Sequence, residues 1–130
     1  MNVKADNRYT EDHEWVQVEE GNVVKVGISH FAQSELGELV FIEVDTVGQT
    51  IEKGEIFGTL EAVKTTSDLF MPVSGTILEF NPELAEDEGD NPALINEDPY
   101  DKGWIVRIEV SDICDLDGLM DAEDYQKLIG

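Results

Sequence analysis

Strand-forming and turn-forming residues alternate in the first third of the chain. Residues 15–18 are rich in strand formers, residues 20–22 have turn chemistry, and residues 23–28 carry apolar side chains at every second position. This pattern predicts a β-hairpin over residues 14–28.

Two short helices are predicted around this β structure. Ser29 is placed as a helix N-cap and Gly37 as a helix end, so we expect a short helix after the first hairpin, through about Leu36. Near the end of the sequence, Asp121 can cap a C-terminal helix over residues 122–129. Three apolar residues of that helix share one side: Tyr125, Leu128 and Ile129.

Apolar segments bounded by glycine, proline and charged residues predict the other strands, at residues 39–44, 56–63, 67–71, 76–80 and 103–110. The segment 39–44 is almost continuously apolar, which predicts burial on both of its faces. We expect residues 64–66 to form a tight connection between two of these strands. Many short strands with little helix indicate a mainly β fold, either a compact barrel or a sandwich.

Residues 81–102 interrupt this pattern. They hold three of the four prolines and the acidic run 86–90, which predicts a long surface loop with room for one helical turn. No linker composition separates a second folding unit. We therefore expect residues 1–130 to form a single domain.

The charge balance narrows the classes of partner. The chain has 30 Asp and Glu against 8 Lys and Arg, a net charge of −22. A field of that sign repels nucleic acid phosphates and anionic lipids, so we expect neither nucleic acid nor membrane as a partner. The acidity fits a basic protein surface, or it provides solubility and salt tolerance. Both explanations remain open.

The number of cysteines and the N-terminal sequence indicate the cellular compartment of the protein. The single cysteine, Cys114, cannot form an internal disulfide, and it is read as a half-buried structural thiol. Residues 1–6 lack the apolar core of a signal peptide, and no run approaches the ~20 apolar residues of a membrane span. We expect a cytoplasmic protein.

The inventory of catalytic groups is thin. His13 and His30 are 17 positions apart and belong to no zinc-binding motif. The glycines form no phosphate-binding loop, and the acidic run 86–90 lacks the spacing of a calcium loop. These absences argue against an enzyme and leave Lys64, on the connection 64–66. From its position alone, Lys64 is either an ordinary turn lysine or an exposed attachment point for a cofactor.

Residues 58–68, Gly-Thr-Leu-Glu-Ala-Val-Lys-Thr-Thr-Ser-Asp, bear on these two interpretations together with motifs elsewhere in the chain. They resemble the lipoylation motif of the glycine cleavage H-protein family, ESVKA-x-S-D, with Lys64 at the modified position. Other motifs of that family recur in the same order: HEW at residues 13–15, GIT-xx-AQ-xx-LG at 27–37, VFVEL at 40–44, PVSG-xxxxx-N at 72–81 and LVN-xx-PY-xx-GW at 94–104. The resemblance runs from about Tyr9 to Tyr125.

The resemblance implies a barrel-sandwich hybrid fold that carries lipoate, joined by an amide to Lys64 on an exposed hairpin. A protein of this family is a carrier and not an enzyme. It takes an aminomethyl group from the PLP-dependent glycine decarboxylase to the tetrahydrofolate-dependent aminomethyltransferase. Dihydrolipoamide dehydrogenase then reoxidises the lipoyl arm of the carrier. A lipoate ligase or lipoyltransferase attaches the cofactor. We expect a monomer of the prokaryotic type.

The resemblance also suggests two acidic residues near the loaded arm, Glu14 of the HEW motif and Asp68. A carboxylate beside a cationic amine makes a charge-assisted hydrogen bond. Without the resemblance, both would be read as solvated surface acids. Ala62 and Thr65 replace the family's usual Ser and Ala beside Lys64, but both are small, so access to the lysine should remain.

Other carriers and a non-carrier role are the alternatives. Biotinyl domains usually flank the lysine with methionines, whereas this chain has Val63 and Thr65. Lipoyl domains of 2-oxo acid dehydrogenases usually have Asp before the lysine and belong to longer chains with linkers. An H-like protein that relays lipoyl groups to other enzymes, and an unmodified acidic protein-interaction domain, remain open.

Overall fold

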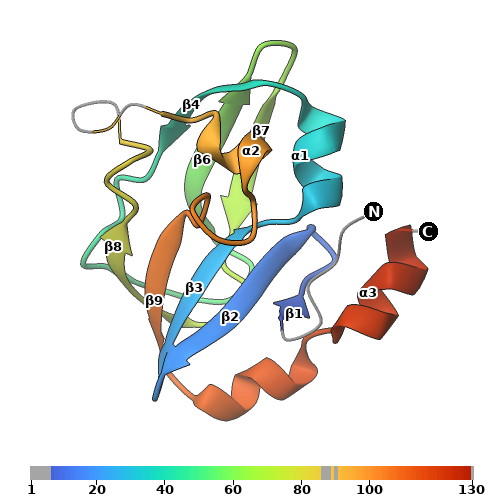
Figure 1. Cartoon of the computed structure of the whole chain (residues 1–130). Helices are drawn as coiled ribbons and strands as arrows, with labels where there is room; N and C mark the ends of the chain where they lie inside the picture. Colours follow the sequence, from blue (N-terminus) through green and yellow to red (C-terminus); the bar gives the residue numbers. More distant parts are fainter. Residues whose placement is uncertain (1–6, 86–88, 90, 130) are drawn as a thin grey trace.

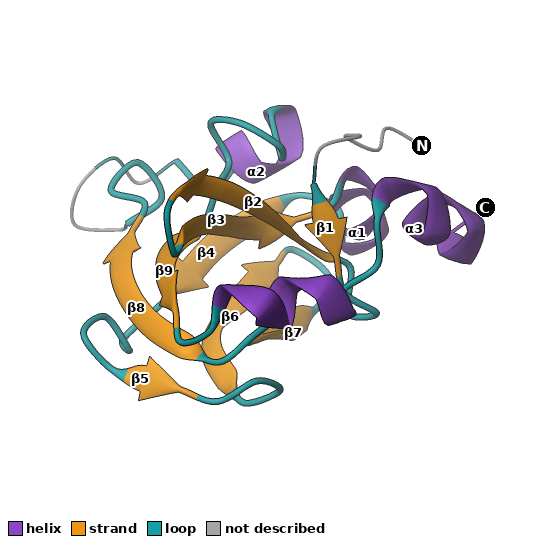
Figure 2. Ribbon diagram, turned by 90° about the horizontal axis from the view of Figure 1, so that it is seen from below, coloured by secondary structure: helices purple, strands orange, loops and turns teal. Residues whose placement is uncertain are grey.

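The computed structural model describes residues 7–85, 89 and 91–129 (Figure 1). Within these residues, the strands form two antiparallel sheets, and the helical segments lie around the outside of the strands (Figure 2). The strands are β1 (Arg8–Tyr9), β2 (Glu14–Glu20), β3 (Val23–Ile28), β4 (Leu39–Glu43), β5 (Thr50–Ile51), β6 (Ile56–Ala62), β7 (Thr66–Phe70), β8 (Gly75–Phe80) and β9 (Val106–Val110). The helices are α1 (His30–Leu36), α2 (Leu94–Glu97) and α3 (Ala122–Ile129), with a 3-10 helix, η1 (Ile113–Gly118).

The larger sheet has six strands in the order β1-β2-β3-β9-β8-β5, and the smaller has three in the order β4-β6-β7. The predicted hairpin is confirmed, because β2 and β3 pair with Glu14 opposite Ile28 and Val16 opposite Val26. The hairpin of β6 and β7 closes the smaller sheet, with Glu61 opposite Thr66. Its tip lies at the top of Figure 1.

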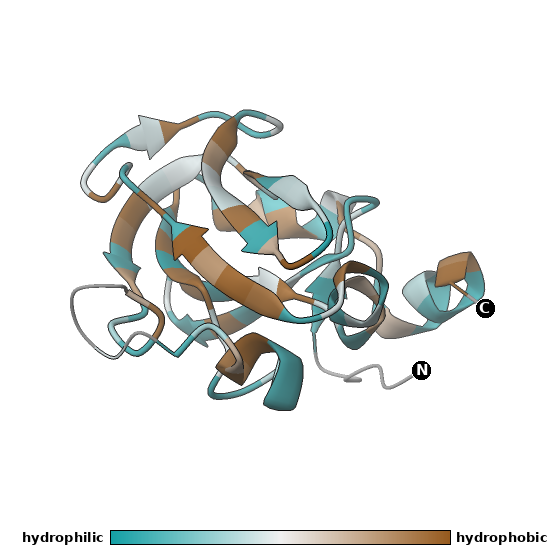
Figure 3. Ribbon diagram, turned by 90° about the horizontal axis from the view of Figure 1, so that it is seen from above, coloured by the Kyte–Doolittle hydropathy of each residue, from teal (hydrophilic) through white to brown (hydrophobic). Residues whose placement is uncertain are grey.

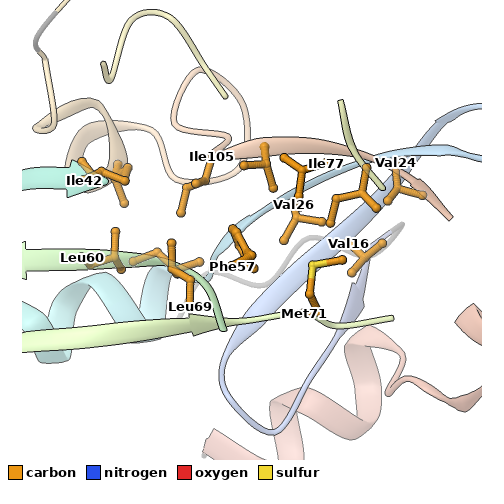
Figure 4. Close-up of a cluster of buried hydrophobic side chains, with 14 of the residues drawn as sticks. Val16, Val24, Val26, Ile42, Phe57, Leu60, Leu69, Met71, Ile77 and Ile105 are labelled. Atoms are coloured by element: carbon orange, nitrogen blue, oxygen red, sulfur yellow. The ribbon is translucent and has the colours of Figure 1, made fainter. Parts of the chain in front are cut away.

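The main core lies between the two sheets (Figure 4). Apolar and polar positions alternate along the strands, as the banded colouring in Figure 3 shows, so each sheet buries one face. The larger sheet contributes Val24, Val26 and Ile108, and the smaller contributes Leu60 and Leu69. This burial removes apolar surface from water and is the main favourable contribution to folding.

A second, aromatic cluster lies under α3. Tyr9, Trp15, Tyr100 and Tyr125 are buried in it, and the rings of Tyr9 and Tyr125 stack with centroids 4.3 Å apart. The Trp15 indole donates a hydrogen bond to the Pro99 carbonyl at 2.8 Å. The stack ties the N-terminal strand to the C-terminal helix.

Three predictions about strands and loops are corrected. The segment 39–44 is not buried on both faces, because the side chains of Val40 and Glu43 are exposed. The last strand begins at Val106 and not at residue 103. Residues 81–102 are not simply a surface loop. They contain the predicted helical turn, α2, and five buried core residues: Leu84, Ala85, Leu94, Ile95 and Tyr100.

Leu128 lies three positions after Tyr125 on α3, and its side chain is 52% exposed. One prediction about a single side chain is also wrong. Cys114 is exposed on η1 and is not half-buried. The sequence patterns missed β1, β5 and η1 altogether. The acidic run 86–90 lies, apart from Gly89, outside the described residues.

Candidate functional site

Lys64 lies in the connection between β6 and β7, and its side chain is exposed. The connection is closed by a hydrogen bond from the Ala62 N–H to the Thr65 carbonyl at 2.7 Å. The stem of the lysine crosses Gly37, since a Cβ at Gly37 would lie 3.3 Å from Lys64 Cε. The ε-amine is therefore presented to solvent from an ordered hairpin tip, as predicted from the sequence.

A cleft of about 410 Å³ adjoins this hairpin. One wall comes from α1, with Phe31, Ala32, Glu35 and Leu36. A second wall comes from the start of β2 and the residues before it, with Asp12, His13 and Glu14. The remaining lining comes from Ile28 at the end of β3, Leu60 of β6, and Ser67, Asp68 and Leu69 of β7. Leu36, which lines the cleft, directly precedes Gly37, the residue next to the lysine stem. The lining of the cleft combines apolar side chains with several carboxylates.

Glu14 is the buried acid of this cleft. Its side chain is only 2% exposed, and its Oε2 accepts a hydrogen bond from the Phe70 N–H at 2.8 Å. Its other oxygen, Oε1, is buried without a hydrogen-bond partner. Burial raises the pKa of the Glu14 carboxyl to about 8. The carboxyl thus lacks one hydrogen bond, which a cationic or other donor group entering the cleft could supply.

Asp68 lies on β7 across the cleft from α1, and its side chain is exposed. In the sheet it is opposite Thr59. The two acids that the resemblance singled out therefore line the same cleft, one buried and one at the surface. The interpretation of Glu14 as a solvated surface acid is wrong, whereas Asp68 is exposed to solvent.

A hydrogen-bond network connects two walls of the cleft, the one that contains His13 and the one formed by α1. The Tyr125 hydroxyl lies 2.5 Å from Ser29 Oγ and 2.9 Å from His13 Nδ1. Ser29 Oγ also accepts the Ala32 N–H and caps α1, as predicted. His13 has a φ of 66°, an uncommon conformation for a residue with a side chain. Burial lowers the pKa of its imidazole, against the opposing effect of Asp12 and Glu35.

The sequence patterns missed this network and the α1 wall. The sequence places His13 in the HEW motif and in no zinc-binding motif, and it places Tyr125 among the apolar residues of the last helix, so neither pattern indicates a hydrogen bond between them. The spacing of Phe31, Ala32, Glu35 and Leu36 is the signal that could have found the wall, because residues three and four apart lie on one face of a helix.

Other candidate chemistry finds no support in the described ranges. Among residues 7–85, 89 and 91–129, no three His, Cys, Asp or Glu side chains are arranged to hold a metal ion. The Cys114 thiol lies beside Asp112, whose charge raises the pKa of the thiol and so lowers its reactivity. Within the same residues, no helix is long and apolar enough to cross a bilayer.

Comparison with known proteins gives a consistent result. Residues 7–130 match the family model described as glycine cleavage H-protein. The chain belongs to the glycine cleavage H-protein family. It is 52% identical to the glycine cleavage system H protein of Chlorobium phaeovibrioides over 131 residues, covering 100% of this chain and 99% of that one.

Two further relatives support the family. The glycine cleavage system H protein of Bacteroides fragilis is 47% identical over 129 residues, covering 99% of this chain and 98% of that one. The crystal structure of the glycine cleavage system H protein from Mycobacterium marinum superposes with a TM-score of 0.82 at 36% identity, covering 97% and 98% of the two chains. The barrel-sandwich hybrid prediction is confirmed by this likeness.

Membership of the H-protein family defines the role of the chain. It is the lipoyl shuttle of the glycine cleavage system, a carrier component without catalytic activity of its own. The family normally carries lipoate, and its members work with the other proteins of that system. The assignment of functional roles to Lys64, Glu14 and Asp68 stays a prediction.

Proposed function

We propose that Lys64 carries lipoate through an amide bond, on a single carrier domain. The shuttle then takes an aminomethyl group from glycine decarboxylase to the aminomethyltransferase, and dihydrolipoamide dehydrogenase reoxidises the arm. One observation carries the assignment: an exposed lysine on an ordered hairpin tip adjoins a cleft that holds a buried carboxyl oxygen without a partner.

The hairpin tip suits attachment by a lipoate ligase or lipoyltransferase. Val63, Lys64 and Thr65 are all exposed, so an enzyme can reach the ε-amine from outside. The tip is nevertheless ordered, since the Val63 N–H donates to the Glu38 carbonyl at 3.0 Å. An ordered tip presents the amine in one place and lowers the entropy cost of the attachment step.

The cleft suits the attached group. A lipoyl group supplies a dithiolane that carries the one-carbon amine between partner enzymes. Leu36, Leu60 and Leu69 offer apolar contacts for the chain of the arm. The Asp68 carboxylate is an acceptor available for a cationic amine, and a cation beside Glu14 Oε1 would favour the ionised form of that carboxyl, which burial otherwise disfavours. Enclosure in the cleft would exclude water from the amine.

Intact mass tests the attachment site. Incubation with a lipoate ligase, ATP and lipoate should add the mass of one lipoyl group to the wild-type protein and none to Lys64→Arg. Lys53→Arg is the matched control, because Lys53 is also an exposed turn lysine. It should be modified like the wild type. An unmodified wild-type protein contradicts the assignment.

Reconstitution tests the shuttle role. Glycine-dependent exchange of CO2 catalysed by glycine decarboxylase should require the lipoylated protein and should be lost with Lys64→Arg. The Lys53→Arg variant should support the exchange at the wild-type rate. Exchange that proceeds equally well without the chain would contradict this role.

A further inference from the structure

The segment between α1 and β4 lies under the lysine hairpin. The Val63 N–H donates to the Glu38 carbonyl at 3.0 Å, and Leu39 pairs with Ala62 at the start of the smaller sheet. A Cβ at Gly37 would lie 3.3 Å from Lys64 Cε and 3.8 Å from its Nζ. Residues 37–39 therefore form the floor on which the lysine stem rests, and we call this segment the floor.

The floor has a backbone conformation that needs support. Gly37 has a φ of 81° and a ψ of −155°, a region that only glycine adopts readily. Its N–H ends α1 by donating to the Gln33 carbonyl at 2.9 Å. Glycine is also the residue with the largest freedom to leave such a conformation. Contacts from elsewhere in the fold must therefore fix the floor.

Asn96 supplies these contacts from α2. Its Nδ2 donates to the Gly37 carbonyl at 2.8 Å and to Gln33 Oε1 at 3.0 Å. Its Oδ1 accepts the Leu39 N–H at 3.0 Å. One side-chain amide thus clamps the floor on both sides of Glu38, whose carbonyl holds the hairpin tip. Both a donor and an acceptor are needed, so a carboxylate or an apolar side chain cannot replace the amide.

We infer that Asn96 is a positioning residue for Lys64. By holding the floor in place, Asn96 fixes the position and direction of the hairpin tip. This inference rests on the proposed attachment of lipoate at Lys64. Asn96 is not needed to hold α2 itself, because its neighbours Leu94 and Ile95 are buried in the core. Two of its three hydrogen bonds, to the Gly37 carbonyl and from the Leu39 N–H, act on the floor, and the third goes to Gln33 Oε1 on α1.

Asn96→Ala tests the inference, with Asn81→Ala as the matched control. Asn81 also makes three side-chain hydrogen bonds, to Lys102, Trp104 and Glu83, and none to the floor. Both variants should lose similar stability. At a temperature where circular dichroism shows each protein folded, kcat/KM for lipoylation by a lipoate ligase should fall about tenfold with Asn96→Ala and stay near the wild-type value with Asn81→Ala.

Hydrogen exchange of the Val63 amide is the second measurement, made on the unmodified proteins. It should be about tenfold faster in Asn96→Ala than in Asn81→Ala, because the Glu38 acceptor is no longer held. Equal lipoylation and equal Val63 exchange in the two variants would overturn the inference. If the wild-type protein is never lipoylated, the proposed function fails, and the Val63 exchange alone still decides whether Asn96 holds the hairpin tip.

Discussion

Glu14 is a buried carboxyl group with one hydrogen-bond donor, from the Phe70 N–H. Its second oxygen is unpaired, so its ionised form lacks compensation in the folded protein. Burial raises its pKa from the ordinary 4.5 to about 8, and this effect exceeds the opposing effect of the Phe70 hydrogen bond. Folding therefore favours the protonated form of this one group.

This shift predicts how stability depends on pH. Between about pH 4.5 and pH 8, the unfolded chain releases the proton that the folded protein keeps, so the contribution of Glu14 to the unfolding free energy falls as pH rises. Glu14→Gln lacks this titration. We expect the unfolding free energy of the variant minus that of the wild type, both measured by urea denaturation, to increase by on the order of 3 kcal/mol between pH 5 and pH 8.

The other titrating groups are present in both proteins, so they cancel in this difference. The carbon-13 chemical shift of the Glu14 carboxyl gives a direct check and should titrate near pH 8. A difference in stability that does not change with pH, together with titration near pH 4.5, would contradict the prediction.

At the scale of single residues, local sequence predicted the exposure of Lys64 but not the burial of Glu14. Lys64 was expected on an exposed connection, and it lies there because turn residues follow a strand. Buried Glu14 is hydrogen-bonded to Phe70, 56 positions away, and lines a cleft with residues of α1. No local pattern around Glu14 contains that information, so only the family resemblance pointed to this residue.

At the scale of elements, α3 connects the C-terminal part of the chain to the cleft. Its Tyr125 is fully buried and stacks on Tyr9 of β1. The Tyr125 hydroxyl is near both Ser29, which caps α1, and His13, which precedes β2. One hydroxyl thus links the starts of two elements that form cleft walls.

Removing only that hydroxyl tests the link. Tyr125→Phe keeps the ring stack but leaves His13 Nδ1 without this partner, so we expect the unfolding free energy to fall by about 1–2 kcal/mol. Urea denaturation measures the loss. A double-mutant cycle with Ser29→Ala should give a coupling energy of about 1 kcal/mol. Strictly additive effects of the two substitutions would show that the hydroxyl does not link α3 to α1.

Elements with a strong local pattern were predicted well, and those that depend on distant pairing were not. The β2–β3 hairpin and both helix N-caps were predicted from alternation and capping residues. In contrast, β5 has only two residues and exists because it pairs with β8. The apolar run 39–44 suggested burial on both faces, but β4 has one partner strand and an exposed face with Val40.

At the scale of the whole molecule, acidic groups far outnumber their partners. The net charge is −22, and the ion pairs among the described residues join Glu19 to Lys25 and Arg107, Glu79 to Arg107, and Glu123 to Lys127. All of these pairs are partly exposed, and such pairs each contribute about 0–1 kcal/mol. Most carboxylates therefore repel one another with little compensation from bases.

This imbalance predicts the response to salt. Salt weakens both the few ion pairs and the general repulsion, and the repulsion involves many more charges. We expect the unfolding free energy from urea denaturation to rise by about 1–2 kcal/mol between about 20 mM and 500 mM KCl. Asp45→Lys with Glu52→Lys is the control, since each reversal raises the net charge by 2, from −22 to −18. This double variant should gain less from KCl, because less repulsion remains to be screened, and an equal gain would show that salt acts independently of the net charge.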